Sequence, residues 1–239
     1  MKKEKVIKRL NSKIFKGVAH RGLHNEKFTE NGLNAFKNAI DKDVAIELDV
    51  HLSKDKELIV CHDDNLIRTT SKEGKIENLT LKEIKENYKL LDGSLVPTLK
   101  EVLALVNEKV PIVIELKPDT NLKNYKEIAI KLMEELKTIN DKSNFIIICF
   151  YPHCLYAIRK YGFIRCLLVG GNTRPYIFRH LFEGVDLDYH LFNKEKYRKS
   201  IKHRFTMSWT IDSLESANIA KKYSDSITFQ NIDFNLLKK

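Results

Sequence analysis

Short apolar runs alternate with amphipathic stretches along the whole chain. Each apolar run has the length of a single strand, and several are apolar at every position, which is typical of parallel strands covered by helices on the outside. We predict nine strands, at residues 17–20, 45–50, 57–62, 111–116, 145–150, 164–169, 184–188, 205–211 and 226–229.

Helical periodicity fills most of the segments between these strands, at about residues 30–40, 80–90, 98–108, 122–138, 152–161, 176–183, 192–202 and 213–223. Such a repeat over 239 residues predicts an α/β fold, a TIM-type (β/α)8 barrel, with one strand more than the barrel needs. A doubly wound open sheet is the alternative, but no glycine-rich phosphate loop follows any predicted strand. We therefore expect one barrel domain over residues 1–239.

Two connections depart from the regular repeat. The link from Leu52 to Lys56 is too short for a crossover helix, so a tight loop must join the second and third strands. The segment from Asp63 to Val110 is much longer than an ordinary connection and carries helical patterns of its own. We expect residues 64–110 to form a small helical insertion at the mouth of the barrel.

Two carboxylates share one face of the second predicted strand. Residues two apart on a strand point the same way, which places Glu47 beside Asp49. Neighbouring carboxylates repel each other unless a cation lies between them, and Mg²⁺ and Ca²⁺ prefer oxygen ligands. A strand whose polar positions face solvent explains the same pair equally well.

The other early strands end in polar groups as well. The carboxyl ends of barrel strands meet at one opening, where barrel active sites are built, so these groups should converge. They are His20, His62, and Glu115 with Lys117. The set suits an anion held partly by a divalent metal, with imidazoles that move protons.

Phosphodiester cleavage requires cations for the phosphoryl oxygens, a base for the nucleophile and an acid for the leaving alkoxide. On this interpretation His20 transfers protons and Arg21 contacts phosphate oxygens through its planar fork. Gly22 then provides a tight turn.

The net charge limits the classes of partner that the sequence supports, and the cysteine content bears on the cellular compartment. The formal net charge of +10 favours an anionic partner, but acidic residues are interleaved with most of the lysines, as on an ordinary solvated surface. We expect no nucleic acid partner, no protein partner and at most weak electrostatic association with membranes. None of the four cysteines forms a CxxC pair, and no segment has the length of a membrane span, which favours a cytoplasmic protein.

The ordered motifs resemble the glycerophosphodiester phosphodiesterases. They are "AHRG", "TENGLNAFKNAIDKDVAIELDVHLSKDKELIVCHDDNLIRTT", "LTLKEI", "VPTLKEVL", "IELKP" and "MSWTID", and they run from about residue 18 to 230. The resemblance implies a TIM-barrel hydrolase that cuts diesters such as glycerophosphocholine and glycerophosphoethanolamine into glycerol 3-phosphate and an alcohol.

The resemblance also implies roles for individual residues. Its paired catalytic histidines fall on His20 and His62, its metal carboxylates on Glu47, Asp49 and Glu115, its phosphate-contacting cations on Arg21 and Lys117, and its Glu-Asn pair on Glu30 and Asn31. Its late tryptophan, expected beside the glycerol moiety, matches Trp209, for which core packing is an equal alternative.

Departures from the family pattern concern the rim of the pocket. They are Gly32 after Asn31, Cys149 before Phe150, and the end of the last strand at 228–231. His51 could reach the pocket by strand parity, but we expect it in a loop beyond the strand. Two other functions remain open: a phospholipase D-like hydrolase of lysophospholipids, which needs an apolar channel, and a non-enzymatic phosphate-binding barrel, which should lack part of the histidine and carboxylate set.

Overall fold

The computed structural model describes residues 3–119, 121–171 and 174–237. Eight parallel strands close into a barrel, because β1 pairs with both β9 and β2 at the two ends of the strand order. The barrel strands are β1 (Val18–Ala19), β2 (Ala45–Leu52), β4 (Ile112–Leu116), β5 (Phe145–Cys149), β6 (Ile164–Val169), β7 (Gly184–Asp188), β8 (Phe205–Ile211) and β9 (Ser226–Phe229). The predicted barrel is confirmed.

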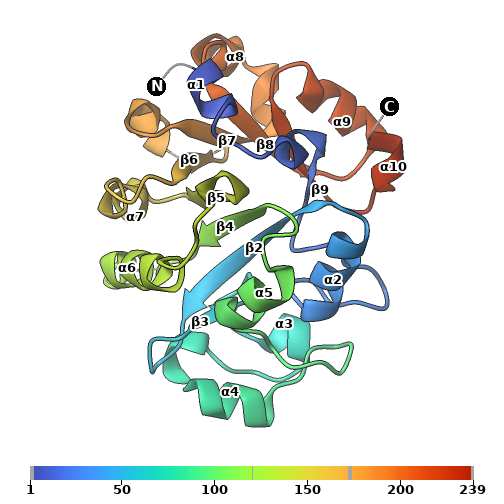
Figure 1. The fold of residues 1–239 in the computed structure, drawn as a ribbon, viewed down its shortest axis with the longest axis vertical. Helices are drawn as coiled ribbons and strands as arrows, with labels where there is room; N and C mark the ends of the chain where they lie inside the picture. The colour runs from blue at the N-terminus through green and yellow to red at the C-terminus, as the bar shows by residue number, and fades with distance from the viewer. Residues whose placement is uncertain (1–2, 120, 172–173, 238–239) are drawn as a thin grey trace.

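Helices cover the outside of the barrel (Figure 1). They are α2 (Leu33–Asp41), α5 (Leu99–Val106), α6 (Tyr125–Glu135), α7 (Pro152–Ala157), α8 (Glu195–Ile201), α9 (Leu214–Lys221) and α10 (Phe234–Leu237), with the 3-10 segments η3 (Lys142–Asn144), η4 (Arg174–Leu181) and η5 (Tyr189–Asn193). The helix predicted near 176–183 is therefore a 3-10 segment. Thr98 and Ser213 begin α5 and α9 with capping boxes, in which the cap side chain and the third helical residue satisfy each other's backbone donors.

Strand parity divides the apolar residues into two cores. Residues such as Ile46, Leu48 and Val50 pack outward against the helices. A second cluster fills the barrel interior, and it includes Val113, Phe205 and Met207. Val6 of α1 (Lys3–Ile7), Ile14 of η1 (Ser12–Lys16) and Leu10 between these segments join this inner cluster, so the start of the chain packs against the barrel interior.

The ninth predicted strand, β3 (Leu58–Val60), lies outside the barrel. It pairs antiparallel with the last residues of β2, from Val50↔Val60 to Leu52↔Leu58. The prediction that β3 is a barrel strand, whose end lies beside three other barrel strand ends, is wrong. His62 reaches the opening because β2 extends past the barrel and β3 folds back along it. His51 likewise lies in β2, paired with Ile59, and is not a loop residue.

The segment after β3 builds a small apolar cluster of its own. It contains α3 (Ile67–Thr70), η2 (Ile76–Asn78) and α4 (Leu81–Asn87). Leu66, Ile84 and Val96 of this segment pack together with Ile59 of β3. By contrast, Leu99, Val102 and Val106 of α5 belong to the main outer core, and α5 packs beside α2. The structure thus separates a compact segment at about 59–96, which we call the insertion, from a helix of the barrel. It lies at one end of the molecule in Figure 1, around α3 and α4.

Candidate active site

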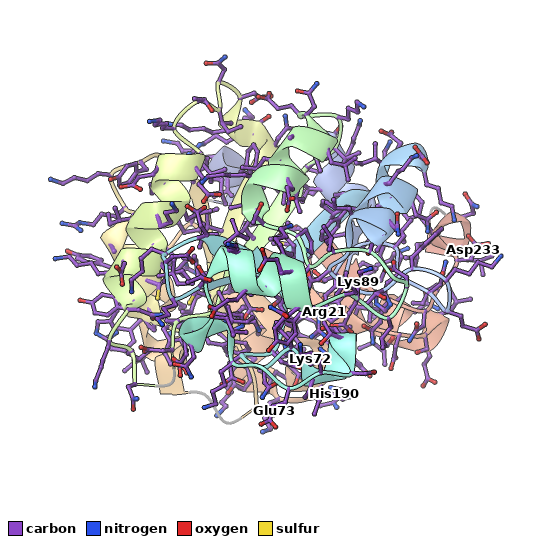
Figure 2. The ribbon with its side chains drawn as sticks, turned by 90° about the horizontal axis from the view of Figure 1, so that it is seen from below. Arg21, Lys72, Glu73, Lys89, His190 and Asp233 are labelled. Carbon is purple, nitrogen blue, oxygen red and sulfur yellow. The ribbon has the colours of Figure 1, made fainter. Side chains whose placement is uncertain are left out.

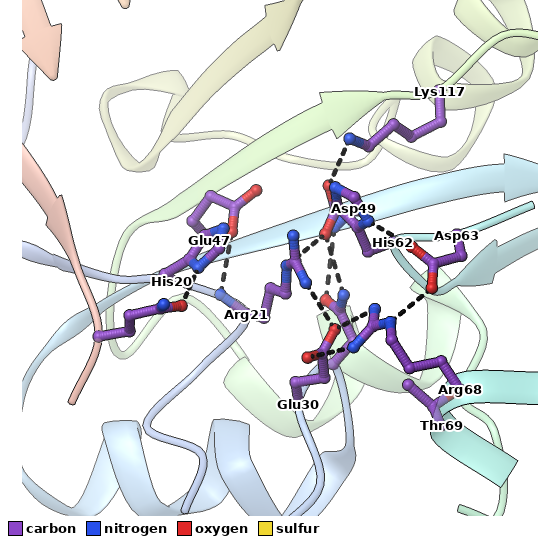
Figure 3. A network of polar contacts seen from close by, with 12 residues as sticks. His20, Arg21, Glu30, Glu47, Asp49, His62, Asp63, Arg68, Thr69 and Lys117 are labelled. Atoms are coloured by element: carbon purple, nitrogen blue, oxygen red, sulfur yellow. Dashed lines mark hydrogen bonds and ion pairs between the residues drawn. The ribbon is translucent and has the colours of Figure 1, made fainter. Parts of the chain in front are cut away.

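The candidate site lies where β1, β2 and β4 end, with the insertion beside it. In Figure 2, Arg21 lies near the centre of the view and Asp233 near its edge, while the labelled Lys72, Glu73 and Lys89 belong to exposed parts of the insertion. The structure brings together every residue that sequence analysis singled out for chemistry. Figure 3 shows His20 near Glu47 and His62 near Asp49, with Arg21 between them.

Three carboxylates meet inside the opening. One oxygen from each of Glu47, Asp49 and Glu115 lies within 4.8 Å of the others. Their exposed fractions are 2%, 1% and 7%, so the alternative of a strand with solvent-facing polar residues is wrong. A buried group of oxygen donors with no sulfur or nitrogen fits a hard divalent cation such as Mg²⁺ or Ca²⁺.

The protein's own cations offset only part of the negative charge. Burial raises the pKa of Glu47 well above its ordinary value, and the charges of Asp49 and Glu115 raise it further. Burial also raises the pKa of Glu115, to about 7. Burial acts the same way on Asp49, but Lys117, His62 and Arg21 outweigh it and hold the pKa of that carboxyl below its ordinary value. Two of the three carboxylates are thus destabilised as anions, which a bound cation would relieve.

Arg21 is held by carboxylates on three sides. Its backbone N–H donates to Glu47 Oε2 at 2.9 Å, its Nη1 lies 2.7 Å from Glu30 Oε1, and its Nε lies 3.5 Å from Asp49 Oδ2. The φ angles of Arg21 and Gly22 are 53° and 79°. A Cβ at position 22 would lie 2.9 Å from Phe36, so this turn requires glycine.

Lys117 and Asn31 fix the carboxylates from the other sides. Lys117 Nζ lies 2.7 Å from Glu115 Oε1 and 3.2 Å from Asp49 Oδ1. Asn31 Nδ2 donates to Asp49 Oδ2 at 3.0 Å. Asp49 therefore has partners on both oxygens, and its orientation is set before any ligand binds.

His20 has a neutral partner, Gln230, at the end of β9. Its Nδ1 lies 2.6 Å from Gln230 Oε1, so Nδ1 carries the hydrogen and Nε2 is the unprotonated nitrogen of the neutral ring. Burial, followed by the charge of Arg21, lowers the pKa of His20 to about 4. His20 is consequently a neutral imidazole at pH 7.

His62 has a charged partner. Its Nδ1 lies 2.7 Å from Asp63 Oδ1, and Arg68 Nε donates to the other oxygen of Asp63 at 2.5 Å. Arg68 also forms two hydrogen bonds with Glu30, at 2.7 and 2.8 Å, and Glu30 binds Arg21. A continuous chain of alternating charges thus joins His62 to Arg21 (Figure 3). Burial, with the charges of Lys117 and Arg21, holds the pKa of His62 below its ordinary value, and the charge of Asp49 and the hydrogen bond to Asp63 oppose this in part.

Sequence analysis did not identify Asp63, Arg68 and Gln230 as parts of the site. Asp63 directly follows His62, and a carboxylate adjacent to a candidate catalytic histidine is the one signal that pointed to it. Arg68 lies in α3 and Gln230 lies 210 positions from His20, so only the folded chain brings them to their partners.

Two cavities open at the site. A chamber of about 90 Å³ is lined by both histidines, Arg21, Glu47, Glu115 and Lys117, and its far wall is formed by Ile148, Phe150, Leu168, Asp186, Trp209, Thr210 and Thr228. A groove of about 450 Å³ shares Glu115, Lys117 and Phe150 with it and runs along the insertion. Trp209 both packs edge-on against Phe150, with ring centroids 5.7 Å apart, and lines the chamber, so the core and pocket interpretations each describe part of its environment.

The low pKa of His20 predicts a pH-dependent stability. The unfolded chain gains the proton near pH 6.5, whereas the folded chain gains it only near pH 4. The neutral ring therefore contributes fully above pH 6.5, and the free energy of unfolding should fall as the pH drops from 6.5 to 4, by about 3 kcal/mol. Urea denaturation with chelator at pH 7 and 4.5 measures this. His20→Gln should lose less stability over that interval than the wild type, and an equal loss would refute the assignment.

Comparisons with known proteins agree with this geometry. The sequence profile described as the glycerophosphoryl diester phosphodiesterase family matches residues 20–175. A glycerophosphodiester phosphodiesterase of Caldanaerobacter subterraneus subsp. tengcongensis is 38% identical over 151 residues, which cover 60% of this chain and 61% of that protein. The chain thus matches about three fifths of the length of that relative.

Solved structures extend the likeness over most of the chain. A glycerophosphodiester phosphodiesterase from Thermotoga maritima is 27% identical with a TM-score of 0.72, over 89% of this chain and 93% of that one. A phosphodiesterase from Oleispira antarctica, solved with the product sn-glycerol-3-phosphate, shares the fold with a TM-score of 0.78 and 21% identity, over 94% of each chain. The resemblance inferred from the motifs is confirmed, and the chain belongs to the glycerophosphoryl diester phosphodiesterase family.

Proposed function

We propose that the protein is a metal-dependent glycerophosphodiester phosphodiesterase, which hydrolyses diesters such as glycerophosphocholine and glycerophosphoethanolamine to sn-glycerol 3-phosphate and an alcohol. The buried oxygen cluster of Glu47, Asp49 and Glu115, with one histidine near each end, carries the proposal. Family membership and the named product in the Oleispira antarctica structure support it.

The three carboxylates would hold Mg²⁺ or Ca²⁺, which supplies positive charge for the phosphoryl oxygens. Arg21 and Lys117 line the same chamber and would offset the remaining charge on these oxygens. Their ion pairs with Glu30, Asp49 and Glu115 fix both cations in place, so little reorganisation accompanies substrate binding.

The different partners of the two histidines suggest different roles. His20 stays neutral because burial and the charge of Arg21 lower its pKa, and its Nε2 can accept the proton of the nucleophile. His62 faces the Asp63 carboxylate, which stabilises an imidazolium ring. We therefore assign His62 as the acid that protonates the leaving alkoxide and His20 as the base.

Release of glycerol 3-phosphate from glycerophosphocholine, measured with and without a chelator, tests the proposal. We expect product only when Mg²⁺ or Ca²⁺ is present. Unchanged release in the chelator would exclude the metal, and no release under either condition would favour the non-enzymatic phosphate-binding alternative.

The groove beside the chamber bears on the lysophospholipase D alternative. Its lining includes apolar residues, but the charged Asp64, Lys75, Glu77 and Asp119 interrupt them, which makes a poor channel for an acyl chain. In the part of the chain that the structure describes, no helix combines the length and apolar character needed to cross a bilayer. The charged groove therefore favours deacylated substrates. A separate observation concerns the compartment: the four cysteines are buried and form no disulfide, which supports a reducing compartment such as the cytoplasm.

The groove predicts a measurable substrate preference. In buffer without detergent, kcat/KM should be higher for glycerophosphocholine than for lysophosphatidylcholine, by roughly 10-fold or more, because the charged side chains that interrupt the groove would lie against the acyl chain and oppose its transfer from the micelle. Parallel choline-release assays on the two substrates measure the ratio. A preference for the lysolipid would support the phospholipase D-like alternative instead.

A further inference from the structure

The chamber contains a buried carboxyl group that the proposed mechanism does not use. Asp186 lies in the middle of β7, between Val185 and Leu187, which both point outward into the helix-covered core. Strand parity therefore turns Asp186 into the barrel, where it is 1% exposed and lines the chamber. Within the described residues, neither of its side-chain oxygens has a hydrogen-bond partner.

Asp186 is separate from the metal cluster. Among the described residues, the group of close ligand atoms contains Glu47, Asp49 and Glu115 but not Asp186. The far wall of the chamber, of which it is part, is otherwise formed by the apolar or aromatic Ile148, Leu168, Phe150 and Trp209, with Thr210 and Thr228. The indole Nε1–H of Trp209 donates to the backbone oxygen of Asp186 at 3.2 Å, so that the ring and the carboxyl line the same part of the chamber.

The apolar wall determines the kind of partner that suits this carboxyl. Burial, together with the negative charge of Glu115, raises the pKa of Asp186 well above its ordinary value, which favours the uncharged acid. An uncharged carboxyl can both donate to and accept from a hydroxyl group, and it gains less from an ammonium group, which would require the ionised form. A buried polar group without a partner is costly, and a ligand hydroxyl would remove that cost.

We propose that Asp186 is a specificity-determining residue, which hydrogen-bonds a hydroxyl of the phosphate substituent lodged in the chamber and thereby selects a polyol over an alkyl group. The inference rests on the proposed function for the position of the phosphate, beside Arg21, Lys117 and the carboxylates. On this proposal the glyceryl part of the substrate lies in the chamber, and the alcohol part lies in the groove.

The test compares two ligands that differ only in hydroxyl groups. Glycerol 3-phosphate and n-propyl phosphate are titrated calorimetrically into the protein with saturating Mg²⁺ or Ca²⁺. The wild type should bind glycerol 3-phosphate more tightly by roughly 10- to 100-fold, because sites built for a hydroxyl strongly reject analogues that lack it. Asp186→Leu, of similar size, should bring that ratio near one while the affinity for propyl phosphate is kept.

Control variants separate recognition from folding. Asp186→Asn retains a hydrogen-bonding group and should retain part of the preference. Asp188→Asn, on the same strand, should leave the ratio unchanged, because Asp188 already bonds His190 at 2.7 Å and does not line the chamber. Asp186→Leu should also unfold at the same or a higher temperature than the wild type, since it removes an unpartnered buried carboxyl.

Several results would overturn the inference. They are an unchanged ratio in both Asp186 variants, an equal loss of affinity for both ligands, no binding of either ligand by the wild type, or tighter binding of phosphoethanolamine than of glycerol 3-phosphate. Hydrolysis is measured separately. Selective binding without diester cleavage would refute the proposed function alone, whereas cleavage with an unchanged ratio would refute the role of Asp186 alone.

Discussion

Replacing His62 with alanine should lower kcat for glycerophosphocholine by about two to four powers of ten, because it would remove one of the two groups to which we assign proton transfer. His20→Ala should cause a loss of the same order. Both side chains lie at the rim of the chamber and are only partly buried, so the variants should remain folded. Steady-state kinetics together with circular dichroism measure both properties. The pH profiles should differ, because the partner of His62 is a carboxylate and that of His20 is an amide.

The chain contains a matched control for His62. His190 forms the same kind of pair, with Nδ1 2.7 Å from Asp188 Oδ1, but it is largely exposed and lies outside the chamber. His190→Ala should therefore keep kcat within about twofold of the wild type. Near-normal turnover in His62→Ala would remove that histidine from the mechanism. A comparable loss in His190→Ala would show that the assay reports general damage and not proton transfer.

Asp63→Asn tests the acid role more finely. The amide keeps the shape of the side chain but carries no charge to stabilise an imidazolium, and its single oxygen cannot accept from both His62 and Arg68. We expect a smaller loss of kcat than in His62→Ala, and a lower apparent pKa for the limb of the pH profile that reports the acid. A variant with the wild-type profile would contradict the assignment of His62 as the acid.

Local patterns were sufficient to predict the barrel and most of the carboxylate site. The period of two in β2 places Glu47 and Asp49 on the inner face whatever the rest of the chain does, and the parallel pairing of Asp49 with Glu115 follows from neighbouring strands in a barrel. The family resemblance then supplied roles for these positions. The repeat of strands and helices contained no information on whether a short strand closes the barrel or folds back upon it.

Long-range contacts account for what the sequence did not predict. Strand β3 is an exception: its three positions are apolar like those of a barrel strand, but the short loop after Leu52 is a local feature that already requires the strand to return antiparallel. Gln230, Arg68 and Asp186 become meaningful only through partners, or a lack of partners, that are set by the folded chain. An aspartate between Val185 and Leu187 looks like an exposed strand position until the barrel closes around it.

Removing the divalent metal should abolish activity and lower the unfolding temperature, because three buried carboxylates then face one another and the nearby charges of Lys117 and Arg21 compensate them only in part. Readdition of Mg²⁺ or Ca²⁺ should restore both properties. A ligand that binds only the folded state adds about 2.7 kcal/mol at a concentration 100 times its Kd, so a concentration-dependent rise in Tm is expected. Metal analysis and differential scanning calorimetry measure the binding and the rise.

Glu47→Gln should make the metal-free protein more stable and should reduce the stabilisation that metal provides. An amide is a weaker metal ligand and carries no charge, so the metal-free variant should be more stable than the metal-free wild type, since it avoids the burial and the repulsion from Asp49 and Glu115 that raise the pKa of Glu47. The same variant should lose most of the rise in Tm on adding metal, and its kcat should fall by roughly 100-fold or more. Glu135→Gln is the control, because it makes the same substitution at a partly buried carboxyl that has no hydrogen-bond partner among the described residues and lies on α6 away from the chamber. That variant should keep the full metal-dependent rise. A normal rise in Glu47→Gln, or zinc bound at a nitrogen-rich site, would refute the carboxylate cluster as the metal site.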